Sequence, residues 1–219
     1  MNQLWLRVMA LLYDPFLCLG ELAGMRRRRR TLLAGASGRV LEIGAGTGLN
    51  LPCYPAAVDE LILAEPEPGM RHRLHRRLQG LGRVARIIDV PAEGLALPDA
   101  SVDTVVSTLV LCTVAEPERA LREIARVLVP EGRLLFIEHV RARSRWLAAW
   151  QDLLLRPWRA FAGGCVCNRD TLETMTACGF TPEIECATWR GMPMIVGPLV
   201  VGRAHRAAAS YADFSGPAL

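Results

Sequence analysis

The chain carries the segment Arg39-Val-Leu-Glu-Ile-Gly-Ala-Gly-Thr-Gly48, and this segment determines the class of fold that the sequence predicts. Its first five residues, 39–43, are mostly aliphatic and have the length of a buried strand. Glycines then alternate with small residues, and glycine allows a tight turn and a close approach of a ligand to the backbone. A glycine-rich turn directly after a strand is typical of a nucleotide-binding loop. We therefore expect a ligand site at the end of this strand.

Strand-like and helical segments alternate on the C-terminal side of this loop. A helix is expected from Thr47 onward, and another over residues 116–129, where the turn at residues 130–132 ends it. Further strands are predicted at residues 60–64, 84–88, 102–107 and 133–140. This alternation predicts crossover units, a mostly parallel sheet and an α/β fold, with ligands at the carboxyl ends of the strands. We assign this domain to residues 39–206.

Composition excludes several classes of protein. Hydrophobic residues make up 51% of the 219 residues and charged residues 22%, which is typical of a globular domain with one core. The net charge of +4 is too small to predict nucleic-acid binding. The seven cysteines are odd in number, and the pair Cys165-x-Cys167 lacks the second pair of a structural zinc site. We expect reduced thiols, no metal and a cytoplasmic location.

The first 38 residues are expected to form a helical lid or cap. Leu4, Val8, Leu11 and Leu12 fall on one helical face, which predicts either packing over the core or a helix on a membrane surface. Polar residues and a proline interrupt the apolar run, so a membrane-spanning helix and a signal peptide are not expected.

A run of positively charged residues follows this apolar run. The five arginines 26–30 encircle a helix, so some of them must contact the fold or a polyanion such as anionic lipid headgroups. Contact with a membrane through residues 1–30 is therefore an open alternative. The last residues, 207–219, are expected to be a flexible tail.

Two carboxylates flank the glycine loop and indicate the charge of its ligand. Glu42 precedes the loop and would repel a pyrophosphate, and Leu49 occupies the position of the third small residue in a dinucleotide fingerprint. S-adenosylmethionine carries an ammonium and a sulfonium and has no phosphate, so these charges favour it over a nicotinamide cofactor. Glu65 ends the second strand, where a carboxylate accepts hydrogen bonds from ribose hydroxyls.

Longer motifs carry a resemblance to a known family. LEIGAGTG (41–48), AEPEPGM (64–70) and the two segments at residues 91–114 and 117–140 resemble the class I S-adenosylmethionine-dependent methyltransferases with a type 11 methyltransferase domain. STLVLCTV (107–114), FIEHV (136–140), Gly163-Gly-Cys165 and VGPLVVG (196–202) are most similar to the small-thiol S-methyltransferases, which are peripheral membrane proteins. Phospholipid N-methyltransferases share the start of the pattern less closely.

The resemblance implies a single Rossmann-like domain with about seven strands, mostly parallel, the last one antiparallel. It implies that Glu65 holds the cofactor ribose and that Ser107 or Thr108 offers a carbonyl group to the adenine. Pro91 stands where many relatives have an acid that binds the adenine amine. The residues that the resemblance places around S-adenosylmethionine are Glu42, Gly44, Ala45, Gly46, Glu65, Pro66, Met70, Ala92, Glu93, Ser107 and Thr108.

Methyl transfer demands little chemistry from the protein, because alignment of the acceptor with the methyl group alone can supply about 7–11 kcal/mol. A free thiol has a pKa near 8.5, so a neighbouring histidine would raise its thiolate fraction. His139 is the candidate catalytic residue, with a structural histidine as the alternative. Cys112, Trp150 and Trp158 are candidates for contact with the acceptor, although packing is the usual role of such residues.

These features favour an enzyme that transfers a methyl group from S-adenosylmethionine to a small lipophilic acceptor, first of all a thiol. A phospholipid or quinone methyltransferase at the membrane surface is one alternative. A non-catalytic module that binds the cofactor is the other.

Overall fold

A computed structural model describes residues 3–207 and contains one seven-stranded sheet in the order β3-β2-β1-β4-β5-β7-β6. β7 is antiparallel to both of its neighbours, and the other neighbouring pairs are parallel. The predicted fold class is therefore confirmed, while most of the predicted tail, from residue 208 on, lies outside the described residues. The strands are β1 (Gly38–Ile43), β2 (Val58–Ala64), β3 (Arg86–Ile88), β4 (Val102–Thr108), β5 (Leu128–His139), β6 (Phe180–Thr188) and β7 (Pro198–Arg206).

The sheet register brings the ends of its central strands to one level. Ile43, the last residue of β1, pairs with Ala64 of β2 and with Ser107 of β4. The residues that follow these strands therefore leave the sheet at the same edge, together with His139 at the end of β5. This alignment builds a site from segments that are distant in the sequence.

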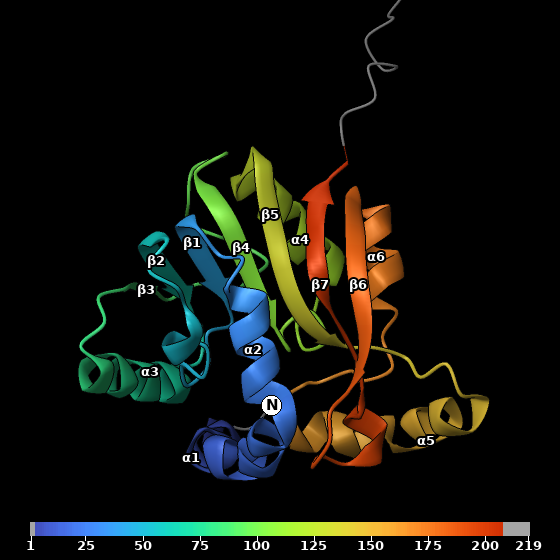
Figure 1. Cartoon of the computed structure of the whole chain (residues 1–219). Coiled ribbons are helices and arrows are strands. Elements are labelled where there is room, and N and C mark those ends of the chain that lie inside the picture. The colour runs from blue at the N-terminus through green and yellow to red at the C-terminus, as the bar shows by residue number, and fades with distance from the viewer. Residues whose placement is uncertain (1–2, 208–219) are drawn as a thin grey trace, which may run out of the picture.

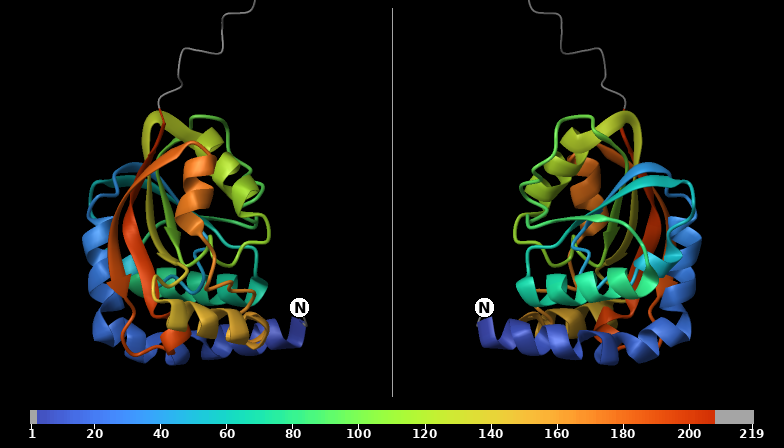
Figure 2. Two further views of the ribbon diagram at one scale, coloured as in Figure 1. Left: turned by 90° about the vertical axis from the view of Figure 1, so that its right-hand side faces the viewer. Right: turned by 90° about the vertical axis from the view of Figure 1, so that its left-hand side faces the viewer.

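Helices cover both faces of the sheet, as its edge-on views show (Figure 2). On one face, α2 (Arg26–Leu33) and α3 (Pro68–Leu81) bury Leu33, Leu74 and Leu78 against the strands. On the other face, α4 (Pro117–Val127) packs on β5, and α6 (Thr171–Ala177) packs on β6 and α4, so that their apolar residues join one core. Each fully buried leucine contributes about 1.5–3 kcal/mol of transfer free energy, so these two layers hold the sheet edge in place.

One predicted helix does not form. From Thr47 the chain makes turns, and only the short 3₁₀ helix η2 (Leu51–Cys53) follows. Pro52 opens this turn and Pro55 ends it, because the residue before a proline is disfavoured in the helical region. The predicted helix at 116–129 exists, but it ends at Val127, where β5 begins directly.

Two helices lie across the carboxyl ends of the parallel strands (Figure 1). They are α1 (Gln3–Gly20) and α5 (Arg145–Phe161), and the 3₁₀ helix η3 (Met194–Val196) lies beside α5. A π-helical turn, η1 (Glu21–Met25), joins α1 to α2, and Gly24 bends the chain there with a φ of 129°. The cap predicted for the N-terminal segment therefore sits over the edge at which ligands are expected.

Leu11 and Leu12 do not lie on the face of α1 that contacts the protein, so the predicted packing over the core is wrong for these two residues, and contact with a membrane surface stays a prediction. Tyr13 and Leu17 face the interior, whereas Leu11 is 61% and Leu12 is 53% exposed. Asp14 fixes this rotation, because its carboxylate accepts hydrogen bonds from Arg77 (2.7 Å) on α3 and from the Thr47 hydroxyl (2.5 Å). An ion pair that the apolar pattern does not reveal thus sets the orientation of the helix.

The arginine run contributes one buried side chain. Arg29 is 4% exposed and donates hydrogen bonds to Glu21 (3.0 Å) and to the side-chain oxygen of Asn50 (2.9 Å). Arg26, Arg27 and Arg30 are exposed. Of this run, Arg29 therefore contacts the fold, whereas Arg26, Arg27 and Arg30 remain at the surface.

Candidate active site

A cavity of about 420 Å³ lies at the carboxyl ends of the strands, beneath α1 and α5. This volume falls within the range of small-molecule sites. One wall comes from the segments that follow β1, β2 and β3, and the other comes from the end of β5, from α1, from α5 and from the connection between β6 and β7. The cavity is therefore lined on one side by the predicted cofactor loop and on the other by the predicted lid.

The glycine loop requires glycine for two different reasons. Gly44, Gly46 and Gly48 have φ values of 54°, 58° and 84°, which most other residues avoid. A β-carbon on Gly44 would lie 2.6 Å from Val110, so the loop could not pack there. A β-carbon on Gly46 would meet only the Gly44 carbonyl oxygen at 3.9 Å, and Gly46 lines the cavity. The backbone at Gly46 is thus left open to a ligand.

Glu65 joins this loop to the second strand. One carboxylate oxygen accepts a hydrogen bond from the Gly46 N–H (2.7 Å), and the other accepts one from the Glu67 N–H (2.9 Å). The side chain is 6% exposed and lines the cavity, and its burial raises the pKa of Glu65. Each carboxylate oxygen keeps a further lone pair, so Glu65 can accept hydrogen bonds from a hydroxyl in the cavity.

Glu42 supports the loop from below and does not line the cavity. Its carboxylate accepts hydrogen bonds from Asn50 (2.8 Å) and from the Tyr54 hydroxyl (2.7 Å). The side chain is fully inside the fold, and this burial raises the pKa of Glu42 to about 7 against the two hydrogen bonds, which lower it. The charge that was predicted to face the ligand is therefore held among side chains.

The raised pKa of Glu42 predicts a pH dependence of stability. Between about pH 4.5 and 7 the native state keeps a proton that the unfolded state has released, so the free energy of unfolding falls as the pH rises through this window. The group contributes about 3 kcal/mol to this fall. Urea unfolding of the wild type and of Glu42→Gln at pH 5, 6, 7 and 8 measures it. The variant should lose this part of the slope, and equal slopes in the two proteins would contradict the prediction.

The remaining predicted cofactor residues fall into two groups. Ala45, Ser107 and Thr108 lie outside the cavity lining: the Ala45 N–H donates to Ala64, Ser107 donates to Glu138 (2.7 Å), and Thr108 accepts from Asn50 (3.0 Å). They therefore brace the loop and the strand ends. The residues that do line the cavity are Gly44, Gly46, Glu65, Pro66, Met70, Ala92 and Glu93, and Pro91 lines it as well.

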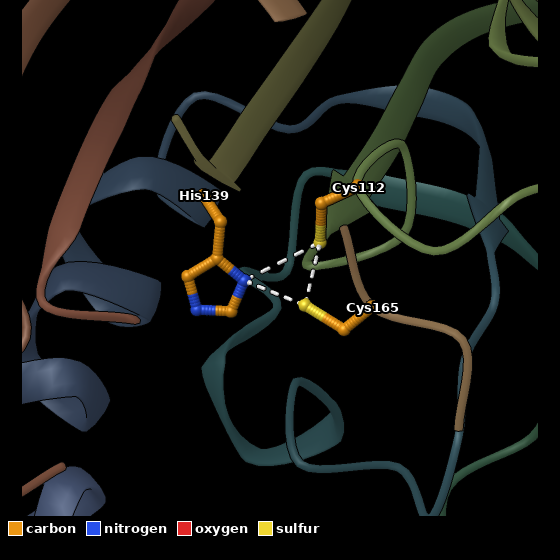
Figure 3. A group of neighbouring side chains, drawn as sticks. All are labelled: Cys112, His139 and Cys165. Carbon is orange, nitrogen blue, oxygen red and sulfur yellow. Dashed lines mark hydrogen bonds between the residues drawn. The ribbon is translucent and has the colours of Figure 1, made fainter. Parts of the chain in front are cut away.

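The opposite wall holds a cluster of two thiols and an imidazole (Figure 3). Cys112 follows β4, His139 ends β5, and Cys165 lies in the loop after α5, yet their reactive atoms meet. The Cys112 sulfur lies 3.3 Å and the Cys165 sulfur 3.5 Å from His139 Nδ1, and the two sulfurs are 3.9 Å apart. The hydrogen bond between Cys112 and Cys165, together with burial, raises the pKa of Cys112 well above its usual range. His139 and Cys165 line the cavity, and Cys112 lies behind them.

Glu138 fixes the turn that carries Cys112. Its buried carboxylate accepts hydrogen bonds from the Ser107 hydroxyl (2.7 Å) and from the N–H groups of Val110, Leu111 and Cys112 (3.1–3.2 Å). Four donors on one carboxylate leave this turn little freedom. The position of Cys112 beside His139 is therefore set by the neighbouring strand.

Comparison with known proteins agrees with this arrangement. A methyltransferase-domain family model matches residues 41–136. The chain is 36% identical over 185 residues to the human thiol S-methyltransferase TMT1B, and the match covers 78% of this chain and 73% of the relative. The chain belongs to the S-adenosylmethionine-dependent methyltransferases. This methyltransferase is also 36% identical over 133 residues to a phosphatidylethanolamine N-methyltransferase of Cereibacter sphaeroides, over 60% of this chain and 65% of the relative. A solved S-adenosylmethionine-dependent methyltransferase of Thermotoga maritima has the same fold, with a TM-score of 0.69 at 22% identity, over 94% of this chain and 100% of that chain.

The charges of the cavity wall fit the cofactor of this methyltransferase. Glu65, Glu67 and Glu93 line the cavity, whereas within the described part of the chain none of the arginines does. Such a wall favours a cationic ligand without phosphate groups, and S-adenosylmethionine is one. The sequence predicted this complementarity from Glu42 and Glu65; Glu65 lines the cavity, whereas Glu42 does not, and Glu67 and Glu93 are the other two acids on the wall.

Aromatic side chains cover the acceptor side of the cavity. Trp158 and Phe161 from α5 line it with Phe16 from α1, and the rings of Phe16 and Phe161 meet edge to face at 5.5 Å. Trp189 stacks on His139 with a centroid distance of 5.7 Å. This side of the cavity is therefore an apolar enclosure around one polar cluster.

Trp150 does not belong to this enclosure, contrary to the prediction. It is 38% exposed and packs edge to face on Trp146. Trp150 lies eleven residues before Phe161 on α5, and the helical rise places it about 16 Å away along the axis, beyond the part of α5 that covers the cavity. Trp150 therefore lies too far along α5 to reach the cavity.

Sequence reasoning missed three residues of the site in this methyltransferase. Tyr13 lines the cavity from α1, and burial raises the pKa of Tyr13 to about 12, so its hydroxyl stays neutral. Trp189 and Cys165 reach the cavity from connections late in the chain. The Gly163-Gly-Cys165 motif could have indicated Cys165. No sequence pattern indicated Tyr13 or Trp189, which are notable only as large aromatic residues.

Proposed function

We propose that this methyltransferase transfers the methyl group to the sulfur of small lipophilic thiols. The observation that carries the proposal is the pairing of an apolar enclosure, which includes Trp158 and Phe161, with the buried cluster Cys112–His139–Cys165 on its wall. Most of the lining of the enclosure is apolar. A polar reacting atom of the acceptor would therefore be placed at the cluster. The human relative named above is a thiol S-methyltransferase, which supports the same acceptor class.

S-adenosylmethionine supplies a methyl group that its sulfonium already activates. The glycine loop would line the methionine part of the cofactor and Glu65 would hold its ribose, while the aromatic enclosure would hold the acceptor in line with the methyl group. A thiol with a pKa near 8.5 is largely protonated at pH 7, so a group that raises its thiolate fraction accelerates the reaction. We assign this role to His139, with Cys112 and Cys165 holding its ring.

The acceptor class is tested with matched compounds. Hexanethiol, hexanol and hexylamine share an apolar body and differ in the reacting atom. Incubation of the full chain with methyl-labelled S-adenosylmethionine and each compound, followed by mass spectrometry, should give methylated product from the thiol alone. Phosphatidylethanolamine vesicles and a demethylated quinone belong in the same series. Product from one of these lipids, and none from the thiol, would assign the chain to lipid methylation.

We further propose that the end of the molecule that carries α1 and α5 docks on a membrane surface. The helical segment Val8–Leu33 is long and apolar enough by composition to cross a membrane, but Gly24 bends it and α1 lines the cavity. Exposed large apolar side chains gather on α1, η1, α5 and η3, which lie together at this end (Figure 1). They include Leu11, Leu12, Leu19, Leu22, Trp146, Leu153 and Met194. An apolar surface of this kind favours an interface with lipid, which is also where lipophilic thiols collect.

Vesicle flotation tests this docking surface. We expect the wild type to float with phosphatidylcholine vesicles, and replacement of Leu11, Leu19 and Leu22 by serine to reduce the floating fraction several-fold. A matched control replaces two other exposed apolar residues, Leu81 at the end of α3 and Val84 in the connection that follows it. Equal loss in both variants, or flotation only with anionic lipid, would argue against an apolar docking surface; the second result would assign binding to the exposed arginines of α2.

A further inference from the structure

The geometry of Cys112, His139 and Cys165 points to a metal site, and we propose that these three residues bind one zinc ion. Zinc bonds of about 2.3 Å to sulfur and about 2.0–2.1 Å to nitrogen in a tetrahedron place two sulfurs about 3.8 Å apart and each sulfur about 3.6 Å from the nitrogen. The corresponding separations here are 3.9 Å between the sulfurs, and 3.3 and 3.5 Å from them to His139 Nδ1. The three donor atoms therefore already form one triangular face of a zinc tetrahedron (Figure 3).

The chain holds this face rigidly through contacts outside it. Glu138 fixes the turn of Cys112, and the Val166 N–H donates to the Cys112 carbonyl (2.7 Å), which ties the loop of Cys165 to that turn. The buried Gln151 side chain donates to the carbonyls of Cys167 (3.0 Å) and Ile195 (2.9 Å). Supporting hydrogen bonds of this kind orient metal ligands and strengthen binding.

The donor set selects the metal. Two thiolates and an imidazole are soft or borderline ligands, which suit zinc and not magnesium or calcium. Two thiolates also balance the charge of a divalent ion, so the buried site would be neutral. The second nitrogen of the ring, His139 Nε2, is buried and has no hydrogen-bond partner among the described residues, so it can carry the proton when Nδ1 binds the metal.

The fourth position of such a site would face the acceptor. His139 and Cys165 line the cavity, whereas Cys112 lies behind them, so the protein supplies three ligands and leaves the cavity side open. Three protein ligands with one open position are typical of catalytic zinc sites, and four are typical of structural ones.

This role rests on the proposed function and refines it, because His139 would then raise the thiolate fraction of the acceptor as a ligand of the metal and not as a base. An acceptor thiol that binds zinc in the open position gives its S–H proton to water and stays on the metal as a thiolate. A lone pair on that sulfur forms the new S–CH₃ bond as the bond between the methyl group and the sulfonium breaks. The broken bond's electron pair stays on the cofactor sulfur, which becomes the neutral S-adenosylhomocysteine. The methylated product is an uncharged thioether, a weaker ligand that leaves the metal.

Metal content and cobalt spectra test the site without an activity assay. The full chain, reduced and purified without chelator, should contain about one zinc ion per molecule. Cobalt added to the metal-free protein should give the visible bands of a tetrahedral ion and a near-ultraviolet band from two thiolates. Cys112→Ser and Cys165→Ser should each weaken cobalt binding at least tenfold and halve the thiolate band. Cys167→Ser is the control, because Cys167 is a buried neighbour outside the cluster.

A folding control and the combination of metal binding with activity separate the outcomes. Calorimetry with S-adenosylmethionine must give wild-type affinity for the variants, which shows that they are folded. A wild type that binds neither zinc nor cobalt at micromolar concentration, or binding that survives in Cys165→Ser, overturns the metal site. Absence of zinc together with thiol methylation would leave the proposed function in place. Stoichiometric zinc without thiol methylation would keep the site and remove the acceptor role.

Discussion

Replacement of His139 by alanine is expected to lower kcat for hexanethiol by about 100-fold or more, while the Kd for S-adenosylmethionine stays unchanged. A group that helps an acceptor lose its proton contributes about 10²–10⁴-fold to a rate. His139 lies at the end of β5 on the acceptor side of the cavity, and the cofactor loop forms the other wall. The two constants are measured by initial rates at saturating cofactor and by calorimetry.

Acceptor acidity separates a catalytic role of His139 from a structural one. An aromatic thiol that is already ionised at the assay pH does not need help to lose its proton, so His139→Ala should slow its methylation far less than that of hexanethiol. Equal losses for both acceptors would show that the histidine only maintains the shape of the pocket, where Trp189 stacks on its ring. His75→Ala, an exposed histidine on α3, is the control and should behave as the wild type.

The parts of this molecule that were predictable from sequence are those that depend on neighbours along the chain. A strand followed by a glycine-rich loop can be predicted from a segment of ten residues. The position of Glu65 follows in the same way, because it is the first residue after β2. The helix expected from Thr47 does not form for an equally local reason, because Pro52 and Pro55 interrupt the segment.

The acceptor side was harder to predict, because its residues meet only in three dimensions. Cys112 and Cys165 are 53 positions apart, and nothing in the local pattern of either shows that both sulfurs reach one imidazole. The rotation of α1 depends on the ion pair between Asp14 and Arg77, 63 positions apart, so the apolar stripe alone left packing and surface contact both open. Predicting such contacts requires the packing of the whole domain.

Replacement of Glu65 by alanine is expected to raise the Kd for S-adenosylmethionine by about 100-fold or more. The Glu65 carboxylate is buried at the cavity wall, where it can accept hydrogen bonds from the two ribose hydroxyls. Each hydrogen bond to a charged group contributes about 1.5–3 kcal/mol, so the loss of two costs about 3 kcal/mol or more. Calorimetry of the wild type and the variant measures the difference, and Glu60→Ala, an exposed carboxylate on the same strand, is the control.

The product complex shows which interaction Glu65 supplies. S-adenosylhomocysteine has the same ribose as S-adenosylmethionine but a neutral sulfur. If Glu65 binds the ribose, Glu65→Ala weakens both ligands by the same factor. If it mainly attracts the positive sulfonium, the cofactor loses far more affinity than the product does. An equal loss is expected, because the hydrogen bonds from Gly46 and Glu67 hold this carboxylate at the junction of the first two strands. The acids Glu67 and Glu93 remain on the wall of the variant to attract the cation.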